Sequence, residues 1–407
     1  MMYSLGIYLY ILCVKIVSLF NSKARLLLDG HAETFGILAR AIRTNDRYVW
    51  FHASSLGEFE QGRPLMERIR ERHPEYKILL TFFSPSGYEV RKNYDGADIV
   101  CYMPFDTCRN ARKFVRMVRP EKAFFIKYEF WKNFIDELHR SGCEVYSVSS
   151  IFRKEQIFFR PYGRQYAKVL ENFTRFFVQN DDSRRLLEAK GIKNVTVSGD
   201  TRFDRVTDIR NAAKEYEVVR EFAGDAENVL VVGSSWEPDE DIIIPYFNSH
   251  KSMKLILAPH VVNESHISRI LESLKRPAVR ITQAAGKDMS AYDCLIVDTY
   301  GMLSSIYRYG NIAYVGGGFG VGIHNVPEAA VYGVPVIIGP NHHKFREAEM
   351  LLRLGGCFEI TSSDTFAMTM DLLTGNEESR SKAGKAAGNY INSNAGAADK
   401  IFETIKW

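Results

Sequence analysis

The chain has 407 residues, which is too long for one hydrophobic core and predicts two domains. Its composition is that of an ordinary globular protein, and a net charge of +4 gives no indication of a nucleic-acid partner. The six cysteines contain no C-x-x-C pair, so we expect buried thiols in a reducing compartment. No H-E-x-x-H motif occurs, and the adjacent His342 and His343 are poorly spaced for joint chelation. We therefore predict no structural metal and no cofactor.

The first twenty residues are almost wholly apolar apart from Lys15 and two serines. A secretory signal begins with basic residues and ends at a small-residue cleavage site, and neither is found here. We therefore expect residues 1–27 to be an uncleaved membrane anchor, with Lys23 and Arg25 keeping the following chain on the cytoplasmic side. The run is marginal for a bilayer span of roughly 20 residues. A buried first helix and a helix in the membrane plane are the alternatives.

From Arg47 onward, short apolar runs alternate with amphipathic segments, which predicts an α/β protein with parallel sheets covered by helices. The pattern restarts near residue 205, after which a charged helical segment is expected at Thr207–Phe222. Two similar halves are expected, with ligands beyond the carboxyl ends of the strands, in a cleft between the halves. The expected strands are Tyr48–His52, Lys77–Phe83, Asp98–Tyr102, Ala123–Ile126, Glu144–Val148, Phe176–Val178, Val195–Ser198, Val229–Val232, Leu255–Ala258, Cys294–Val297, Ile312–Val315 and Val334–Ile338.

Polar residues follow several of the expected strands. Ser55 could cap a helix after the first strand, and Glu58 is either part of its capping box or a general base at the mouth of a cleft. Glu129, after another strand, is either a second cleft carboxylate or a surface charge. Arg202 closes the first half. A basic and aromatic segment at 152–164 is either a cover for an anionic lipid headgroup or a solvated loop.

The second half contains small and polar residues at its strand ends. The turn Gly233-Ser234-Ser235 could offer N–H groups and hydroxyls to a phosphate. His260 follows the next strand, where a lone histidine is either a ligand contact or structural. The segment 298–303 precedes another expected helix.

The most informative stretch runs from Asn311 to Pro340 and reads as strand, glycine-rich turn, helix Val326–Tyr332 and strand. Its glycines permit positive φ and close approach of backbone N–H groups to an anion. A helix N-terminus near Asn325 favours phosphate, and Glu328 could accept hydrogen bonds from ribose hydroxyls. The spacing matches neither G-x-G-x-x-G nor a Walker loop. The stretch therefore indicates either a nucleotide site or a tight turn without a ligand.

Taken together, these stretches resemble the 3-deoxy-D-manno-octulosonic acid (Kdo) transferases, which act on lipid A precursors. Each motif alone is weak, but their order and spacing over nearly the whole chain are specific. The matching features are the apolar N-terminus, S-x-G-E at Ser55–Glu58, E-x-W-x-N at Glu129–Asn133, G-D-x-R-F-D at Gly199–Asp204, G-S-S at Gly233–Ser235, L-A-P at Leu257–Pro259, D-T-x-G-M-L at Asp298–Leu303 and the glycine-rich stretch Gly316–Pro340.

The resemblance implies a GT-B glycosyltransferase with two Rossmann-like domains, inverting and without need of a metal for the transfer. Residues 1–27 would be the anchor, residues 28–205 would bind the acceptor, and residues 206–407, with C-terminal helices, would bind the donor. The implied donor is CMP-Kdo and the implied acceptor a lipid A precursor (lipid IVA) in lipopolysaccharide core synthesis. The implied location is the inner membrane, with the catalytic domains on its cytoplasmic face.

Site residues can be carried over by position. Glu58 would be the catalytic base that takes the proton from the acceptor hydroxyl. The acceptor side of the cleft would hold Ser55, Gly57, Glu129 and Arg202. The nucleotide site would hold Ser234, Ser235, His260, Gly301, Met302, Gly316, Gly317, Gly318, Asn325 and Glu328.

The sequence departs from the family pattern at three places, which affects the expected donor contacts more than the reaction. The departures are His260 and Val261 where L-x-P-R-H is usual, Val326 and Ala329 where prolines are common, and Lys127 where an acidic residue is expected. The nearest alternative is a GT-B transferase or epimerase that uses a UDP-sugar. A dinucleotide-dependent oxidoreductase is disfavoured by the missing G-x-G-x-x-G, and a non-enzymatic membrane-associated binding protein is the third alternative.

Overall fold

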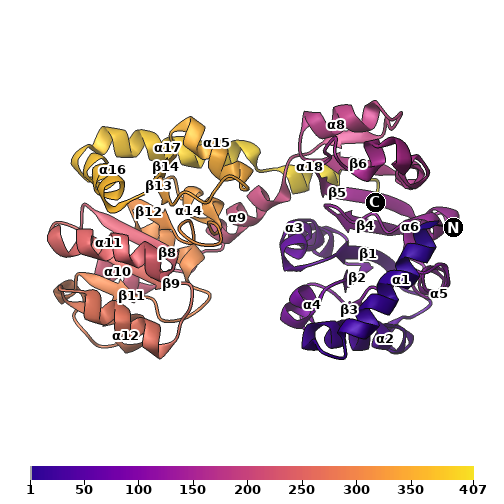
Figure 1. The fold of residues 1–407 in the computed structure, drawn as a ribbon, viewed down its shortest axis with the longest axis horizontal. Coiled ribbons are helices and arrows are strands. Elements are labelled where there is room, and N and C mark those ends of the chain that lie inside the picture. Colours follow the sequence, from indigo (N-terminus) through magenta and orange to yellow (C-terminus); the bar gives the residue numbers. More distant parts are fainter. Residues whose placement is uncertain (1) are drawn as a thin grey trace. The chain divides into compact units, whose positions relative to one another are not determined.

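The structure is a computed structural model and describes residues 2–407. The chain divides into unit 1, residues 1–205 and 395–407, and unit 2, residues 206–394. Each unit contains a seven-stranded sheet in which every pairing is parallel (Figure 1). The predicted α/β class with two Rossmann-like domains is therefore confirmed.

Unit 1 has the strand order β3-β2-β1-β4-β5-β6-β7, so the order reverses between β1 and β4. Its strands are β1 Arg47–Ala53, β2 Tyr76–Phe82, β3 Ile99–Tyr102, β4 Lys122–Ile126, β5 Glu144–Ser150, β6 Arg175–Val178 and β7 Val195–Val197. Its helices are α1 Met2–Val17, α2 Ser22–Ala41, α3 Leu56–Arg72, α4 Pro85–Arg91, α5 Cys108–Val118, α6 Lys132–Arg140, α7 Arg164–Ala167, α8 Asp181–Glu188 and α18 Ala397–Thr404, and α9 Thr201–Asn211 crosses the boundary after Arg205.

Unit 2 has the order β10-β11-β9-β8-β12-β13-β14, which reverses between β8 and β12. Its strands are β8 Val229–Ser235, β9 Lys254–Pro259, β10 Ala278–Arg280, β11 Cys294–Ile296, β12 Ile312–Val315, β13 Val336–Ile338 and β14 Cys357–Glu359. Its helices are α10 Glu217–Ala223, α11 Glu237–Ser249, α12 Glu264–Ser273, α13 Leu303–Ile306, α14 Val326–Ala330, α15 Arg346–Leu354, α16 Ser363–Gly375 and α17 Glu377–Asn394.

Both faces of the unit 1 sheet are covered, and successive residues of β1 supply the two cores. Trp50 packs with α5 and α6 residues such as Phe114 and Phe134. Val49 and Phe51 pack on the opposite face with residues of α3 and α18. Apolar residues at every position of a strand are typical of a parallel sheet buried on both sides.

The end of the chain returns to unit 1, whereas the expected second domain extended to residue 407. Figure 1 shows α18 in yellow among the elements of unit 1. Phe402 lies in the core beside α3, Trp407 stacks on His73 with ring centroids 5.0 Å apart, and Arg68 Nε lies 2.5 Å from Asp399 Oδ1. The C-terminal segment is therefore part of the fold of unit 1.

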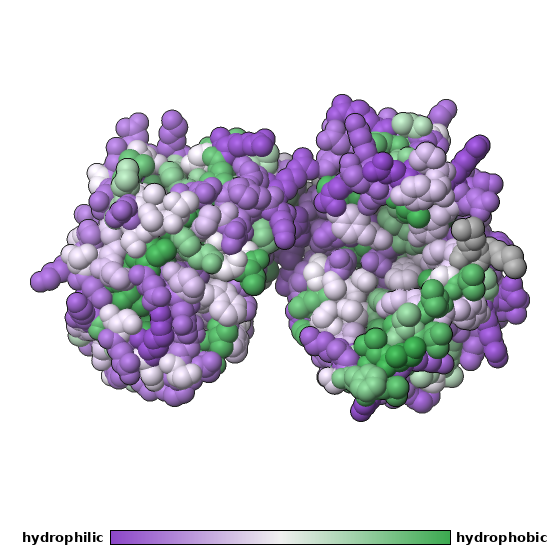
Figure 2. All heavy atoms as spheres, viewed as in Figure 1, coloured by the Kyte–Doolittle hydropathy of each residue, from purple (hydrophilic) through white to green (hydrophobic). Residues whose placement is uncertain are grey.

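Helix α1 packs against the rest of unit 1 along one side. Tyr3 stacks on Tyr166 and its hydroxyl donates to Asp106 Oδ2 at 2.5 Å, while Val14 is buried. Much of its remaining surface is apolar and exposed, as the green band along α1 in Figure 2 shows. Within residues 2–407, no helix combines the length and the apolar character that crossing a membrane requires.

Candidate functional site

The amino-terminal end of α3 holds the predicted base. Ser55 is the N-cap of α3, Gly57 is exposed and Glu58 lies half-buried in the first turn. A capping box would join the Ser55 and Glu58 side chains to backbone N–H groups. Instead, the Ser55 hydroxyl donates a hydrogen bond to Glu58 Oε2. The Glu58 carboxylate is therefore held by a side chain that follows β1, not by the helix backbone.

Glu129 follows β4, the neighbour of β1, so both predicted carboxylates leave the sheet where the strand order reverses. Trp131 Nε1 donates to Glu129 Oε2 at 2.5 Å, and His52 Nε2 lies 3.3 Å from the same oxygen. His52 is fully buried in β1, with its Nδ1 atom 2.9 Å from Thr81 Oγ1. No sequence pattern pointed to His52, because its contact with Glu129 depends on the pairing of β1 with β4.

Arg202 lies at the start of α9 and is fixed by a buried carboxylate. Its Nε and Nη2 atoms lie 2.9 and 2.8 Å from Asp200 Oδ2, and Gln61 Nε2 donates to Asp200 Oδ1 at 3.0 Å. The Arg202 side chain is still 45% exposed. This guanidinium is therefore oriented by Asp200 and remains accessible to an anionic ligand.

In unit 2 the glycine-rich turn follows β12, beside β8, where that sheet also reverses its order. A Cβ atom on Gly316 would overlap the carbonyl oxygen of Ser234, and one on Gly318 would lie 2.6 Å from Gly339 Cα. Gly317 has a φ of 92°. Glycine is thus required by close backbone packing at two positions and by backbone conformation at the third.

The buried carboxylate of Asp239, in α11, organises this turn. It accepts hydrogen bonds from Gly317 N–H at 3.0 Å, Trp236 N–H at 2.9 Å and the Tyr314 hydroxyl at 2.7 Å. Burial, and secondarily the charge of Asp239, raises the pKa of Tyr314, so this hydroxyl stays protonated and donates. The Gly317 N–H is consequently engaged within the protein.

The two serines after β8 have different environments. Ser235 is buried, and its hydroxyl donates to Glu240 Oε1 at 2.8 Å. Glu240 also contacts His266 Nε2 at 2.9 Å. Ser234 is half-buried and has a φ of 54°, a left-handed conformation that is uncommon for serine. Of this pair, Ser234 is the one whose hydroxyl is suited to a ligand.

Three rings form a stack at the same edge of the sheet. Trp236 and His260 have ring centroids 4.6 Å apart, and those of His260 and His324 are 4.4 Å apart. Trp236 Nε1 donates to His324 Nε2 at 3.1 Å. Desolvation, and then the nearby His260, lowers the pKa of His324, which favours the neutral acceptor form. Sequence spacing did not reveal Trp236 or His324, which meet only because β8 pairs with β12.

The remaining predicted nucleotide residues lie on two neighbouring segments. Gly301, with a φ of 87°, and Met302 precede α13. That helix packs at the end of β8, since a Cβ atom on Gly233 would lie 3.0 Å from Leu303 Cδ1. The helix expected at Val326–Tyr332 ends at Ala330, and at its start Asn325 Nδ2 donates to Glu328 Oε1 at 2.6 Å.

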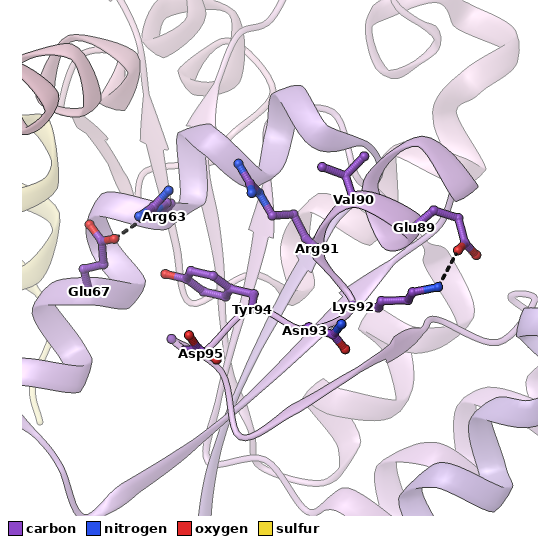
Figure 3. Close-up of a pocket in the computed structure, with 10 residues that line it drawn as sticks. Arg63, Glu67, Glu89, Val90, Arg91, Lys92, Asn93, Tyr94 and Asp95 are labelled. Atoms are coloured by element: carbon purple, nitrogen blue, oxygen red, sulfur yellow. Dashed lines mark hydrogen bonds and ion pairs between the residues drawn. The ribbon is translucent and has the colours of Figure 1, made fainter. Parts of the chain in front are cut away.

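A separate hollow of about 480 Å³ lies on unit 1 between α3 and the segment after α4 (Figure 3). Arg63 and Glu67 pair on one side of it at 2.6 Å, and Lys92 and Glu89 pair at 2.9 Å on the other. None of the predicted site residues lines this hollow. Its charges neutralise one another, so we do not include it in the candidate site.

Comparison with known proteins agrees with the motifs. Residues 29–205 match the family model described as 3-Deoxy-D-manno-octulosonic-acid transferase (kdotransferase). The 3-deoxy-D-manno-octulosonic acid transferase of Aquifex aeolicus is 27% identical over 322 residues, covering 77% of this chain and 82% of the relative. That of Chlamydophila psittaci is 24% identical over 385 residues, covering 91% and 88%.

Solved structures share the fold at low identity. A UDP-GlcNAc 2-epimerase from Neisseria meningitidis has a TM-score of 0.60 at 14% identity, with 88% of this chain and 99% of that chain covered. MurG from Acinetobacter baumannii has a TM-score of 0.55 at 9% identity, with the same coverages. These likenesses concern the fold alone, whereas the motifs and the sequence relatives agree on one family. The family model over residues 29–205 and the sequence relatives all carry the name 3-deoxy-D-manno-octulosonic acid transferase, and the relatives cover most of this chain.

Proposed function

We propose that the protein transfers Kdo from CMP-Kdo to a lipid A precursor in lipopolysaccharide synthesis. The observation that carries this proposal is that the family match covers residues 29–205 of unit 1, in which Glu58 and its hydroxyl partner Ser55 follow β1. The relatives are named as Kdo transferases, and their alignments extend into unit 2. The acceptor, the donor and the stereochemical course are part of the proposal.

Unit 2 would hold the CMP moiety around the reversal between β8 and β12. The N–H groups of Gly316 and Gly317 already donate to Gly233 O and to Asp239, so they are not free for phosphate. Among residues 2–407, the N–H groups of Gly318 and Phe319 have no protein acceptor. These two groups and the Ser234 hydroxyl are suited to the single CMP phosphate.

The other nucleotide contacts would come from the surrounding residues. The stack of Trp236, His260 and His324 offers a flat ring surface beside the turn. Glu328 and Asn325 could exchange hydrogen bonds with ribose hydroxyls. In this arrangement His260 would contact the ligand where the family usually has an arginine.

In unit 1, the Glu58 carboxylate would take the proton from the acceptor hydroxyl as that oxygen attacks the anomeric carbon of Kdo. The bond between Kdo and CMP breaks in the same step, so the configuration at the anomeric carbon inverts and CMP leaves as an anion. The Ser55 hydroxyl fixes one carboxylate oxygen of Glu58 and leaves the other for the acceptor. Positioning of this kind is what a general base requires.

A transfer assay tests the proposal. Detergent-solubilised protein receives Kdo, a CMP-Kdo-generating system and tetra-acylated lipid A precursor, and the lipid product is examined by mass spectrometry. A mass increase by one or more Kdo units is expected. Absence of product from protein that binds CMP would refute the proposal that the acceptor is a lipid A precursor. Absence of both product and CMP binding, with UDP bound instead, would refute the donor and favour a UDP-sugar enzyme.

We also propose that α1 lies in the plane of the inner membrane, with the catalytic units on the cytoplasmic face. Apolar side chains such as Leu5, Leu9 and Leu12 are exposed along α1. A hollow of about 610 Å³ is lined by Tyr8 of α1 and by basic residues of α5. The exposed basic residues of α5 are Arg109, Arg112, Lys113 and Arg116. Apolar and basic surfaces side by side are suited to the interface of an anionic bilayer.

Sedimentation with anionic vesicles tests this second proposal. Leu9→Glu should reduce the vesicle-binding constant at least about 10-fold, because one leucine contributes roughly 1.5–3 kcal/mol when it leaves water. Binding should also weaken as salt rises or as anionic lipid is replaced by zwitterionic lipid. Met368→Glu is the matched control, since Met368 is also well exposed, at 72% against 61% for Leu9, but lies on α16 of unit 2. Equal binding by the two variants would contradict the proposal.

A further inference from the structure

The loop after β13 carries two histidines, His342 and His343, that the proposed transfer reaction does not use. Their spacing argued against joint chelation, yet the structure turns one ring nitrogen of each toward the same carboxylate in α15. His342 Nδ1 lies 2.9 Å and His343 Nδ1 3.0 Å from Glu349 Oε1. All three potential ligand atoms lie within 4.8 Å of one another.

The second nitrogen of His342 identifies which of its ring atoms is protonated. His342 is only 2% exposed, and its Nε2 atom lies 2.7 Å from Glu359 Oε2, at the end of β14. A carboxylate only accepts hydrogen bonds, so Nε2 carries the proton in the neutral ring. The lone pair of His342 is then on Nδ1, which lies 2.9 Å from another acceptor, Glu349 Oε1.

This places two electron pairs 2.9 Å apart, one on the buried His342 and one on the half-buried Glu349. Within residues 2–407, His342 Nδ1 has no hydrogen-bond partner, because its approach to Glu349 lacks hydrogen-bond geometry. The arrangement is favourable only if a positive charge lies between the two atoms. A metal cation bound by both atoms would supply that charge.

We propose that His342, His343 and Glu349 bind one divalent transition-metal ion, with Zn²⁺ as the best match. Imidazole nitrogen and carboxylate oxygen are ordinary zinc ligands at about 2.0–2.2 Å, which places tetrahedral ligand atoms roughly 3.3 Å apart. The observed separations of 2.9 and 3.0 Å from Glu349 Oε1 need only a small expansion, and the two histidine nitrogens already lie within 4.8 Å of each other. Glu359 supplies the carboxylate that orients a zinc-bound histidine through its other nitrogen.

The ion would be structural, and its position links it to the glycine-rich turn. Asn341, the neighbour of His342, donates through its N–H to Gly318 O at 2.9 Å and through Nδ2 to Gly320 O at 2.7 Å. A cation that joins the next two residues to α15 would therefore also restrain the turn. This inference is independent of the transfer activity.

Metal binding by the untagged full chain tests the inference. Protein stripped with a chelator and desalted is titrated with Zn²⁺ in competition with a chromophoric chelator, and one saturable ion per chain is expected. Zinc at about 100 times its dissociation constant should raise the melting temperature of unit 2 by roughly 5–10 °C. Co²⁺ in place of Zn²⁺ should give the visible absorption of a low-coordinate site.

Variants separate this site from weaker surface binding. His343→Ala should abolish the saturable binding and the thermal shift. The His343 side chain is 79% exposed, so the substitution should leave the fold intact. Glu359→Gln should weaken binding roughly 10- to 100-fold by loosening His342. His139→Ala, another exposed histidine, is the control and should bind like the unaltered protein.

Two results would overturn the inference. One is equal zinc binding by His343→Ala and His139→Ala. The other is a nitrogen NMR spectrum of His342 that shows both ring nitrogens protonated in the presence of excess zinc, because the second proton would then be the positive charge.

Discussion

Replacing the buried Asp239 by alanine should loosen the glycine-rich turn. Asp239 is 1% exposed and accepts hydrogen bonds from Gly317, Trp236 and Tyr314. The substitution leaves these three donors without their acceptor. It also removes the side-chain hydrogen bond that joins α11 to the turn at Gly317.

The expected loss of unfolding free energy follows from the three donors that lose their acceptor. Each buried donor left unsatisfied costs about 1–3 kcal/mol, and partial access of water to the gap reduces the sum, so we expect a loss of about 3–6 kcal/mol. Asp239→Asn should lose less, about 1–3 kcal/mol, because one oxygen remains. Asp241→Ala is the matched control, since Asp241 is in the same helix but is exposed and pairs with Arg269 at the surface. Such a pair contributes at most about 1 kcal/mol.

Hydrogen exchange is the appropriate assay because the chain has two units, and the exchange of individual segments shows which unit is affected. In Asp239→Ala, the Gly317 amide and its neighbours should exchange roughly 10²- to 10⁴-fold faster, which corresponds to about 3–6 kcal/mol. CMP affinity should fall in parallel. If Asp239→Ala and Asp241→Ala exchanged at the same rate in this segment, Asp239 would not be the anchor of the turn.

Three further predictions concern the base, the turn and the response to acid. Glu58→Gln should lower kcat by about 10²- to 10⁴-fold in the transfer assay while CMP affinity is kept; Glu67→Gln in the same helix should not, and equal losses would remove Glu58 from its role. Gly318→Ala should weaken CMP binding by about 1–3 kcal/mol in calorimetry, because its Cβ would lie 2.6 Å from backbone atoms, whereas Gly320→Ala has 3.7 Å of space and serves as control. Burial lowers the pKa of His31 to about 4. The unfolded chain therefore binds this proton below about pH 6.5 and the folded chain only below about pH 4, so unit 1 should lose up to about 3 kcal/mol of stability over that range. Urea unfolding of His31→Phe should show a shallower acid loss, and an unchanged slope would contradict this assignment.

The strands that could be predicted are those with a continuous run of β-branched and aromatic residues. Tyr48–His52 and Ile312–Val315 match β1 and β12 closely, because burial on both faces leaves an apolar residue at every position. The missed strands β10 and β14 are three residues long and contain Arg280 and Glu359, so they lack that signature. The return of the C-terminus to unit 1 depends on long-range packing that local patterns do not encode.

The candidate site was predictable in its positions but not in its hydrogen bonds. Glu58, Glu129 and the glycines could be placed because parallel strands end at one edge of each sheet, where the strand order reverses. Which donors remain available is decided by partners far away in the sequence. Glu240 takes the Ser235 hydroxyl and Asp239 takes the Gly317 N–H. A sequence motif therefore overstates the number of groups that can reach a ligand.

These same internal bonds explain why a turn with so many glycines can still form a defined site. Glycine allows the close approach of the backbone. It also raises the entropic cost of fixing the turn, because it has the most conformational freedom to lose. Here Asp239 holds Gly317, and Asn341 holds both Gly318 and Gly320, so the backbone is fixed before a ligand arrives. Binding then pays less ordering entropy. Donor affinity should consequently depend on Asp239 and on the Asn341–His343 loop, although the proposed phosphate contacts are made by neither.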